Sequence, residues 1–346
     1  LPMNELLLRV ISMYGDKVKV AFSISGTAIE QFEQYAPRVL DSFRRLSDTG
    51  CVEFLTETYS HSLASLENRD EFFSQVRKHS QKIEEIFGQK PRTFRNTELI
   101  YSNSIGEQVY KMGFHTMLTE GARHIMGWKS PNYVYCDETQ PKLKLLLRNY
   151  GLSDDIAFRF SNKDWAEWPL TAEKYVEWLK NAEGEIVNLF MDYETFGEHQ
   201  DSDSGIFEFM SSLPDAVIRS GEFDFVTPSQ AARRHEAVDE LSAPEAISWA
   251  DEERDTSAWL GNELQKEAFS KLYGLVEKLS IIDDAVLWND FGHLQESDHF
   301  YYMCTKFFSD GDVHKYFNPY ETPYEAFINY MNVLSDFMIR INEHAE

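Results

Sequence analysis

Short apolar runs rich in strand-forming residues alternate with longer amphipathic stretches from the start of the chain to about residue 230. The strands predicted from these runs cover residues 18–25, 51–57, 93–98, 116–119, 143–148, 186–192 and 223–227. The stretches between them are long enough for crossover helices, and the one over residues 72–87 ends at Gly88, a typical helix stop. This alternation predicts a parallel α/β sheet.

Polar and acidic side chains follow more than one of the predicted strands. This favours a closed or nearly closed β/α barrel over an open sheet, because an open sheet gathers its chemistry at one switch point. After about Leu241 the predicted strands stop, and residues 258–279 and 324–341 have the pattern of amphipathic helices joined by a polar, aromatic-rich loop. We expect a barrel domain in residues 1–240 and a helical C-terminal subdomain in residues 241–346.

The composition argues against several classes of partner. A formal charge of −25 over 346 residues would repel nucleic acid and an anionic membrane surface. Cys51, Cys136 and Cys304 lie far apart, without the spacing of a disulfide framework or a zinc site, which fits a reducing compartment. No basic-apolar-small leader pattern opens the sequence, and no apolar run reaches the roughly 20 residues of a membrane-spanning helix. We expect a cytoplasmic protein, and nothing in the sequence indicates its oligomeric state.

The segment MDYETFGEHQ at residues 191–200 brings several acids and an imidazole directly after a predicted buried strand. Asp192, Glu194, Glu198 and His199 follow within eight positions, and Gly197 lets the backbone bend between them. In a barrel enzyme, the carboxyl ends of the strands present the chemical groups. The segment therefore predicts one part of an active site.

A second carboxylate, Glu98, ends the predicted strand 93–98. Glu98 and Asp192 form a natural pair for retaining glycoside hydrolysis, which needs a nucleophile and an acid about 5 Å apart. Arg95 lies off the face of Glu98 in an ideal strand, so the chain must bend if Arg95 is to keep a nucleophile ionised. Strand-end acids with nearby arginines also occur as purely structural pairs.

Four ordered blocks carry a resemblance to a known family. FRNTELIY at 94–101 and MDYETFGEH at 191–199 resemble the third and fourth conserved regions of glycoside hydrolase family 57. VEFLTETYSHSLASL at 52–66 is similar to the second region, and SWADEERDTSAWLG at 248–261 resembles the fifth. This family contains α-amylases, 4-α-glucanotransferases, amylopullulanases and branching enzymes that act on α-glucans.

The resemblance implies a (β/α)7 barrel followed by a helical region that completes the substrate cleft. It makes Glu98 the catalytic nucleophile and Asp192 the general acid/base of a retaining reaction through a glycosyl-enzyme, without metal or cofactor. The partner that it implies is an α-glucan oligosaccharide or polysaccharide. The side chains that it places near the substrate are Glu57, His61, Arg95, Glu194, His199, Asp251, Asp255 and Trp259.

One region of the family has no counterpart here. Its first region is a strand near the amino terminus that ends in a His-Gln pair, whereas this chain opens on an apparent helix at residues 4–13. We expect that the opening strand is missing from this sequence, which would leave an unpaired edge in the sheet.

Tryptophans and histidines outside these blocks have two interpretations each. Trp128, Trp165 and Trp168 could form outer sugar subsites or anchor loops, and Trp259 could stack on a glucose ring or fill the core. His293 and His299, with Asp298, have no recognised metal-ligand spacing, so we expect solvated or hydrogen-bonded histidines and no metal site.

The main hypothesis is an α-amylase-like hydrolase of α-1,4-glucans. A 4-α-glucanotransferase would use the same residues, and a non-catalytic glucan-binding protein would keep only the fold. A metal-dependent polysaccharide deacetylase would need an Asp/His/His ligand set, which we cannot assemble at the predicted strand ends.

Overall fold

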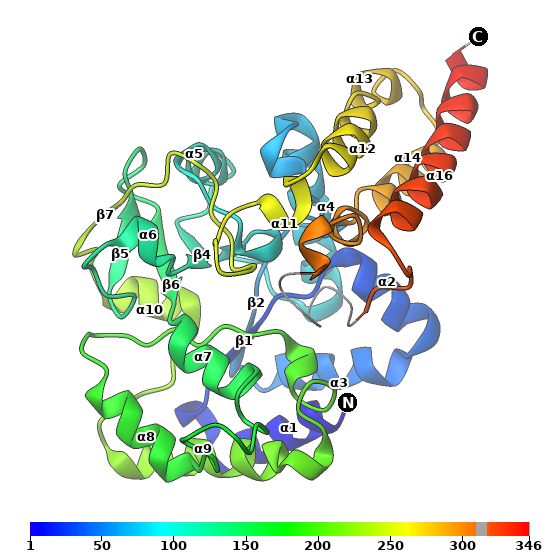
Figure 1. Ribbon diagram of the computed structural model, residues 1–346. Coiled ribbons are helices and arrows are strands. Elements are labelled where there is room, and N and C mark those ends of the chain that lie inside the picture. Colours follow the sequence, from blue (N-terminus) through cyan, green and yellow to red (C-terminus); the bar gives the residue numbers. More distant parts are fainter. Residues whose placement is uncertain (309–316, 346) are drawn as a thin grey trace.

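A computed structural model describes residues 1–308 and 317–345 of the chain (Figure 1). The strands are β1 (Val20–Phe22), β2 (Val52–Phe54), β3 (Phe94–Arg95), β4 (Thr116–Glu120), β5 (Val134–Asp137), β6 (Lys144–Arg148) and β7 (Asp239–Leu241). The helices up to residue 240 are α1 (Pro2–Tyr14), α2 (Gly26–Tyr35), α3 (Pro37–Asp48), α4 (Arg69–Phe87), α5 (Asn103–Lys111), α6 (Arg123–Met126), α7 (Tyr150–Ala157), α8 (Ala172–Asn181), α9 (Ile206–Ser220) and α10 (Pro228–Arg234). Those that follow are α11 (Ser257–Leu260), α12 (Glu263–Tyr273), α13 (Val276–Leu279), α14 (Ala285–Leu294), α15 (Ser297–Tyr301) and α16 (Pro323–Ala345).

The strands form two sheets. One contains β1 and β2, and the other has the order β3-β4-β6-β5-β7. All neighbouring strands are parallel except β5 and β6. Single bridges extend this order, from Thr56 to Phe94 between the two sheets and from Arg148 to Asn188 beyond β6. The α/β alternation and the parallel pairing are confirmed, but the hydrogen-bonded strands of the described residues do not close into a (β/α)7 barrel.

The predicted strand over residues 186–192 is wrong, because side chains bond the backbone groups of Phe190 in its middle. Asn188 makes one bridge, with its carbonyl accepting the N–H of Asn149 at 2.9 Å. Beyond it, the Arg148 Nε donates to the Phe190 carbonyl at 2.7 Å, and the Phe190 N–H donates to Ser153 Oγ at 3.2 Å. The segment is therefore extended without being a ladder strand, and most of it is half-buried.

The predicted strand over residues 223–227 is also wrong. Its last residue, Thr227, caps α10, and its N–H donates to Gln230 Oε1 at 3.0 Å. Phe223 and Phe225 are half-buried and line a large cavity instead of pairing in a sheet.

The outer edge of β1 faces the same cavity. Among the described residues β1 pairs with β2 alone, and residues 19–25 line the cavity. The unpaired edge expected from the sequence is therefore present.

Two helical predictions need correction. The amphipathic stretch after the first strand, whose apolar residues from Ile29 to Leu46 predict one helix, is divided into α2 and α3, because Ala36 precedes Pro37 and adopts φ −142°. The loop expected between the C-terminal helices contains α14 and α15. By contrast, α4 ends at Gly88 as predicted, where φ is 66°.

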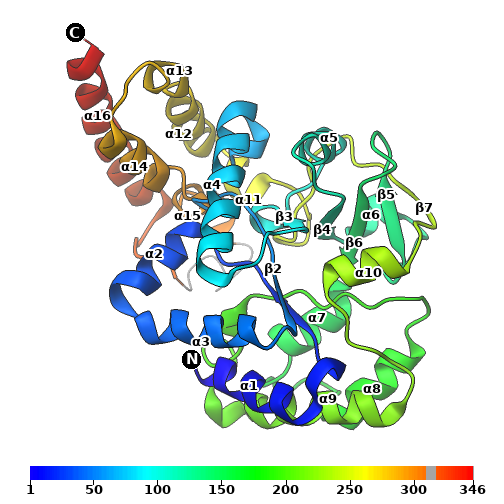
Figure 2. The same cartoon turned by 180° about the vertical axis from the view of Figure 1, so that it is seen from behind.

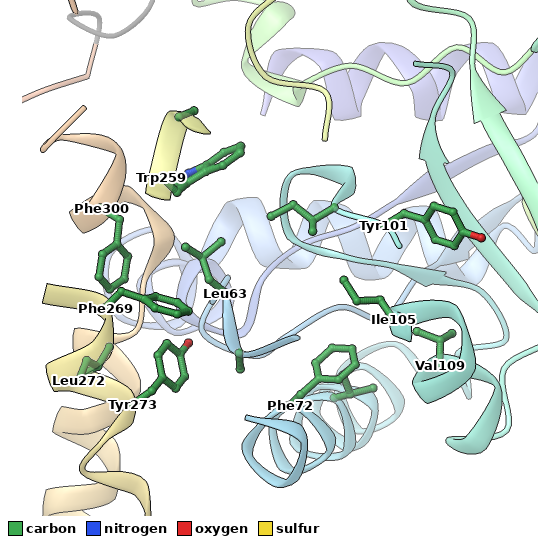
Figure 3. Packing of buried hydrophobic residues seen from close by; sticks show 14 of the residues in the cluster. Leu63, Phe72, Tyr101, Ile105, Val109, Trp259, Phe269, Leu272, Tyr273 and Phe300 are labelled. Atoms are coloured by element: carbon green, nitrogen blue, oxygen red, sulfur yellow. The ribbon is translucent and has the colours of Figure 1, made fainter. Parts of the chain in front are cut away.

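The helices α12, α13, α14 and α16 gather at one end of the molecule, α11 and α15 lie nearer its middle, and α1, α8 and α9 lie at the other end (Figures 1 and 2). One hydrophobic cluster joins the C-terminal helices to the first half of the chain. In it, Phe269 and Phe300 lie close to Leu63, and Phe72 of α4 belongs to the same cluster (Figure 3). The C-terminal helices are thus fixed beside the loop after β2. No helix in the described part of the chain is long and apolar enough to span a membrane.

Candidate active site

A cavity of about 1850 Å³ contains most of the side chains that the sequence singled out. Its walls come from the segments after β1, β2 and β3, from residues 185–196, from the loop 249–254 and from α15. Of the predicted site residues, it is lined by Glu57, His61, Arg95, Glu98, Asp192, Glu194, His199, Asp251 and Trp259. Asp255 does not line it, because its Oδ1 accepts hydrogen bonds from the N–H and the hydroxyl of Ser257.

The backbone turns sharply at Glu98. The strand β3 ends at Arg95, and the single turn Thr97–Leu99 follows, in which Glu98 has the left-handed angles φ 56° and ψ 27°. A non-glycine residue in this region is strained, and such strain is typical of functional sites. Asn96 and Thr97 hold the turn with buried side-chain hydrogen bonds to the Ile100 and Ser62 carbonyls. The bend that the sequence required between Arg95 and Glu98 is present.

Both carboxylate oxygens of Glu98 have a partner. His61 Nε2 lies 2.8 Å from Oε1, and the indole N–H of Trp249 donates to Oε2 at 2.6 Å. Burial alone would raise the pKa of Glu98, but these two bonds and the charges of His61 and Arg95 outweigh it and lower the pKa. Glu98 is therefore an anion at neutral pH, while 21% of its side chain stays exposed to the cavity.

His61 is the cation that stabilises Glu98. Its Nδ1 lies 2.9 Å from Oε2 of Glu57, a carboxylate with only 1% of its surface exposed. Burial opposes the charge of His61, but the two carboxylates on its ring raise its pKa to about 10. Despite its burial, Glu57 has its pKa lowered to about 2 by His61 and by Arg95, whose guanidinium lies 3.5 Å away. The imidazolium thus donates to a carboxylate on each side.

Arg95 has a different partner from the one predicted. It pairs with Glu57 and lies over the Trp249 ring at 5.0 Å, so its effect on Glu98 comes from charge at a distance. The sequence missed Trp249, although this residue lies within the block at 248–261 that carried part of the resemblance.

The electrostatic environment of Asp192 is the opposite of that of Glu98, because it favours the protonated carboxyl group. Its side chain is exposed to the cavity, yet the cavity walls surround it and restrict its solvation. This confinement and the negative charges of Glu194 and Glu98 raise its pKa to about 7. Since solvent in the cavity reaches the carboxyl, we assign much of this rise to the two carboxylates. The backbone after it turns as expected, with Gly197 at φ 122°.

Arg148 is a second site residue that the sequence did not identify. It ends β6 and is buried, with one guanidinium nitrogen 3.0 Å from Glu120 and the other on Asp154. Its guanidinium also lies 5.5 Å from the centre of the Trp249 ring. Its place at a strand end was the signal that could have found it, and it supports the tryptophan that bonds Glu98.

The C-terminal helices also contribute to the cavity. Asp298 and Tyr301 of α15 line it, although the sequence considered Asp298 only as a metal ligand. The two histidines considered with Asp298 bond each other, since His299 Nε2 donates to the backbone carbonyl of His293 at 3.1 Å. Within the residues described, no group of three or more His, Cys, Asp or Glu side chains could hold a metal ion.

The tryptophans divide between the two interpretations. Trp259 is 1% exposed and packs against Tyr301 in the main hydrophobic cluster, so it is a core residue (Figure 3). Trp165 packs on Trp178 at 5.9 Å and anchors its loop. Trp128 is 91% exposed and lies outside the cavity wall.

The remaining polar candidates belong to the wall of the cavity. Asp251 has φ 54° and lies 3.6 Å from the ammonium group of Lys306. His199 contacts the Phe317 ring at 5.9 Å between centroids. Glu194 is exposed to the cavity beside Asp192 and acts on it by its charge.

Known proteins resemble this chain in sequence and in fold. The sequence profile of glycosyl hydrolase family 57 matches residues 1–244. A protein of Methanocaldococcus jannaschii named "Putative alpha-amylase" is 44% identical over 356 aligned positions, which cover 99% of this chain and 75% of that protein.

Solved structures show the same fold at low sequence identity. A family 57 branching enzyme from Thermococcus kodakaraensis superposes with a TM-score of 0.73 at 14% identity, over 100% of this chain and 85% of that one. A 4-alpha-glucanotransferase from Thermococcus litoralis gives a TM-score of 0.67 at 14% identity, over 85% of this chain and 51% of that one. By sequence and by fold, the chain belongs to glycosyl hydrolase family 57.

Proposed function

We propose that this protein is a retaining glycoside hydrolase of the α-amylase type that cleaves α-1,4-glucans through a glycosyl-enzyme. In this proposal Glu98 is the nucleophile and Asp192 is the general acid/base. The supporting observation is that two carboxyl groups of one cavity have opposite electrostatic environments. His61 and Trp249 stabilise the charge of Glu98, whereas Glu194 and Glu98 oppose the charge of Asp192.

This difference is what double displacement requires. The nucleophile must be ionised, and the acid must carry a proton that it can deliver near neutral pH. A half-buried Glu98 with both oxygens bonded meets the first requirement, and a pKa of about 7 for Asp192 meets the second. A binding protein without catalysis has no need of such a pair.

The proposed reaction has two steps. Glu98 attacks the anomeric carbon while the proton of Asp192 passes to the departing glycosidic oxygen, which leaves as a sugar hydroxyl. Asp192, now ionised, then takes a proton from water, which attacks the anomeric carbon and releases Glu98 as a carboxylate. The net result is hydrolysis with retention, for which the two carboxyl groups must lie about 5 Å apart.

The alternative is a 4-α-glucanotransferase, which shares the first step and uses a sugar hydroxyl in the second. A cavity of about 1850 Å³ that is open to solvent has room for either acceptor. The same residues serve both reactions, so the acceptor must be identified from the products.

We also propose that the scaffold is a (β/α)7-type barrel domain over residues 1–240 with a helical subdomain over 241–346. The parallel pairs and the two single bridges place β1, β2, β3, β4, β6 and residue 188 in sequence order, which supports this assignment.

Incubation with maltoheptaose tests the function. Shorter sugars alone indicate hydrolysis, longer sugars indicate transfer, and no new products with measurable binding support a non-catalytic glucan-binding protein. Proton NMR of the first products gives the stereochemistry, because retention releases the α-anomer and inversion the β-anomer. Accumulation of the β-anomer would exclude Glu98 as a nucleophile.

A further inference from the structure

The short helix α15 is attached directly to the loop that carries His61. The N–H of Ser297 donates to the carbonyl of His61 at 3.0 Å, and Ser62 forms an antiparallel bridge with Glu296. His61 itself has φ 49°, so its carbonyl is aimed by an unusual backbone conformation. The start of α15 is therefore held within one residue of the imidazolium that bonds Glu98.

A buried polar network holds this contact in place. Gln75 Oε1 accepts hydrogen bonds from the N–H of Ser60 at 3.1 Å and from the hydroxyl of Ser62 at 3.0 Å. The Gln75 amide donates to Gln295 Oε1 at 2.9 Å, and the Gln295 amide donates to Glu71 at 2.8 Å. All these side chains are buried, and such fully bonded buried networks make a structure rigid. The network joins α4, the His61 loop and the residue two positions before α15.

This arrangement fixes the backbone that carries the Asp298 side chain into the cavity. Asp298 is exposed there, and no hydrogen bond or ion pair of its carboxylate is found within residues 1–308 and 317–345. The charged groups that act on it are Glu98, Glu296, His61 and His299, so it faces the same space as the proposed nucleophile. A carboxylate that stands on a rigid backbone in a cavity, without an ion pair, is suited to accept hydrogen bonds from a neutral polyhydroxy ligand.

We propose that Asp298 is a substrate-binding residue whose carboxylate accepts hydrogen bonds from hydroxyl groups of the sugar ring bound at Glu98. This inference rests on the proposed function and assigns to the C-terminal helices a direct part in holding the reacting ring. It also explains why the residue lies at the end of a rigid network, since a hydrogen bond to a sugar hydroxyl selects substrate only when its acceptor is fixed.

The test compares Asp298→Asn with the wild type on maltoheptaose and on α-maltotriosyl fluoride. Loss of hydrogen bonds to a charged acceptor should lower kcat/KM by about 10- to 100-fold on both substrates. The loss should be similar for the two, because the fluoride removes the need for a proton donor but not the need to bind the ring. Asp283→Asn is the matched control, because Asp283 is exposed and lies outside the cavity wall. It should match the wild type.

A panel of monodeoxy maltosyl fluorides, each altered in the ring that carries fluorine, identifies the contact. At one hydroxyl position, removal of that hydroxyl should abolish the difference between the wild type and Asp298→Asn, because both partners of one bond are then absent. Thermal melting and near-UV circular dichroism of Asp298→Asn should match the wild type.

Three results would overturn the inference. The first is an unchanged kcat/KM for Asp298→Asn, and the second is an equal loss on every deoxy substrate. The third is recovery on the fluoride, which would make Asp298 a proton donor. A wild-type protein that turns over neither substrate would refute the proposed function instead. Calorimetry would then still test the contact, by comparing the affinities of the wild type and of Asp298→Asn for maltoheptaose. Equal affinities would overturn it.

Discussion

The hydrogen bond from Trp249 to Glu98 should set the acid limb of the pH–rate profile. It is 2.6 Å long and is stronger to a carboxylate than to a neutral carboxyl group, so it stabilises the ionised form. A hydrogen bond to a charged group contributes about 1.5–3 kcal/mol, and one pKa unit corresponds to about 1.4 kcal/mol. Because Glu98 keeps its bond to His61 and is 21% exposed to solvent, we expect the lower end of this range.

Trp249→Phe should therefore raise the pKa of Glu98 by about one unit. Activity needs ionised Glu98, so the acid limb of kcat/KM moves to higher pH by the same amount as this pKa. The basic limb belongs to Asp192 and should stay in place. The assay is kcat/KM for maltoheptaose from about pH 3 to 9, a range that brackets the reference pKa values of both carboxyl groups.

Trp288→Phe is the control for this variant, because Trp288 is a partly buried tryptophan of α14 outside the cavity wall. Its profile should match the wild type at both limbs. An acid limb that stays fixed in Trp249→Phe would show that the indole does not stabilise the titrating carboxylate, or that this carboxylate is not Glu98.

Further predictions concern the two acids and the buried arginine. Glu98→Gln should form no glycosyl-enzyme with any substrate while maltoheptaose binding persists by calorimetry, and turnover equal to the wild type would refute the assignment. Asp192→Asn should lose most activity on glucans but keep turnover of activated aryl maltooligosaccharides, with azide accelerating its second step; equal losses on both substrates would contradict an acid role. The wild-type rate should fall as pH rises through about 7, where Asp192 loses its proton, and a flat profile up to alkaline unfolding would contradict this. Arg148→Met leaves Glu120 buried without its closest cation and should lower the free energy of unfolding by about 3–5 kcal/mol in urea, whereas Arg44→Met at an exposed pair should cost under about 1 kcal/mol.

Local signals in the sequence found the elements whose structure depends on near neighbours. The stop of α4 at Gly88 and the α/β alternation follow from conformational preference and periodicity, and both were predictable. The strand expected over 186–192 failed for a tertiary reason, since Arg148 and Ser153 take the backbone groups of Phe190. No pattern within the segment itself carries that information.

The same distinction applies to the candidate site. Glu98 and Asp192 were found because each follows an apolar run, and the resemblance then added Glu57 and His61. Asp298 was not recognised as a residue of the cavity, because the short helix that presents it is defined by contacts with the His61 loop. A helix of five residues has too little periodicity to be recognised alone.

The geometry around His61 shows how one side chain connects the two ends of the chain. Its ring is held by Glu57 and Glu98 from the first hundred residues, and its carbonyl is bonded by Ser297 from the C-terminal helices. A shift of α15 therefore has to move either the ring or the strained backbone that carries it. Because the ring determines how well Glu98 remains ionised, the docking of the C-terminal helices and the charge of the proposed nucleophile are coupled through one residue. Substrate bound to Asp298 would act on this same contact, so that ring binding and the readiness of Glu98 to attack depend on each other.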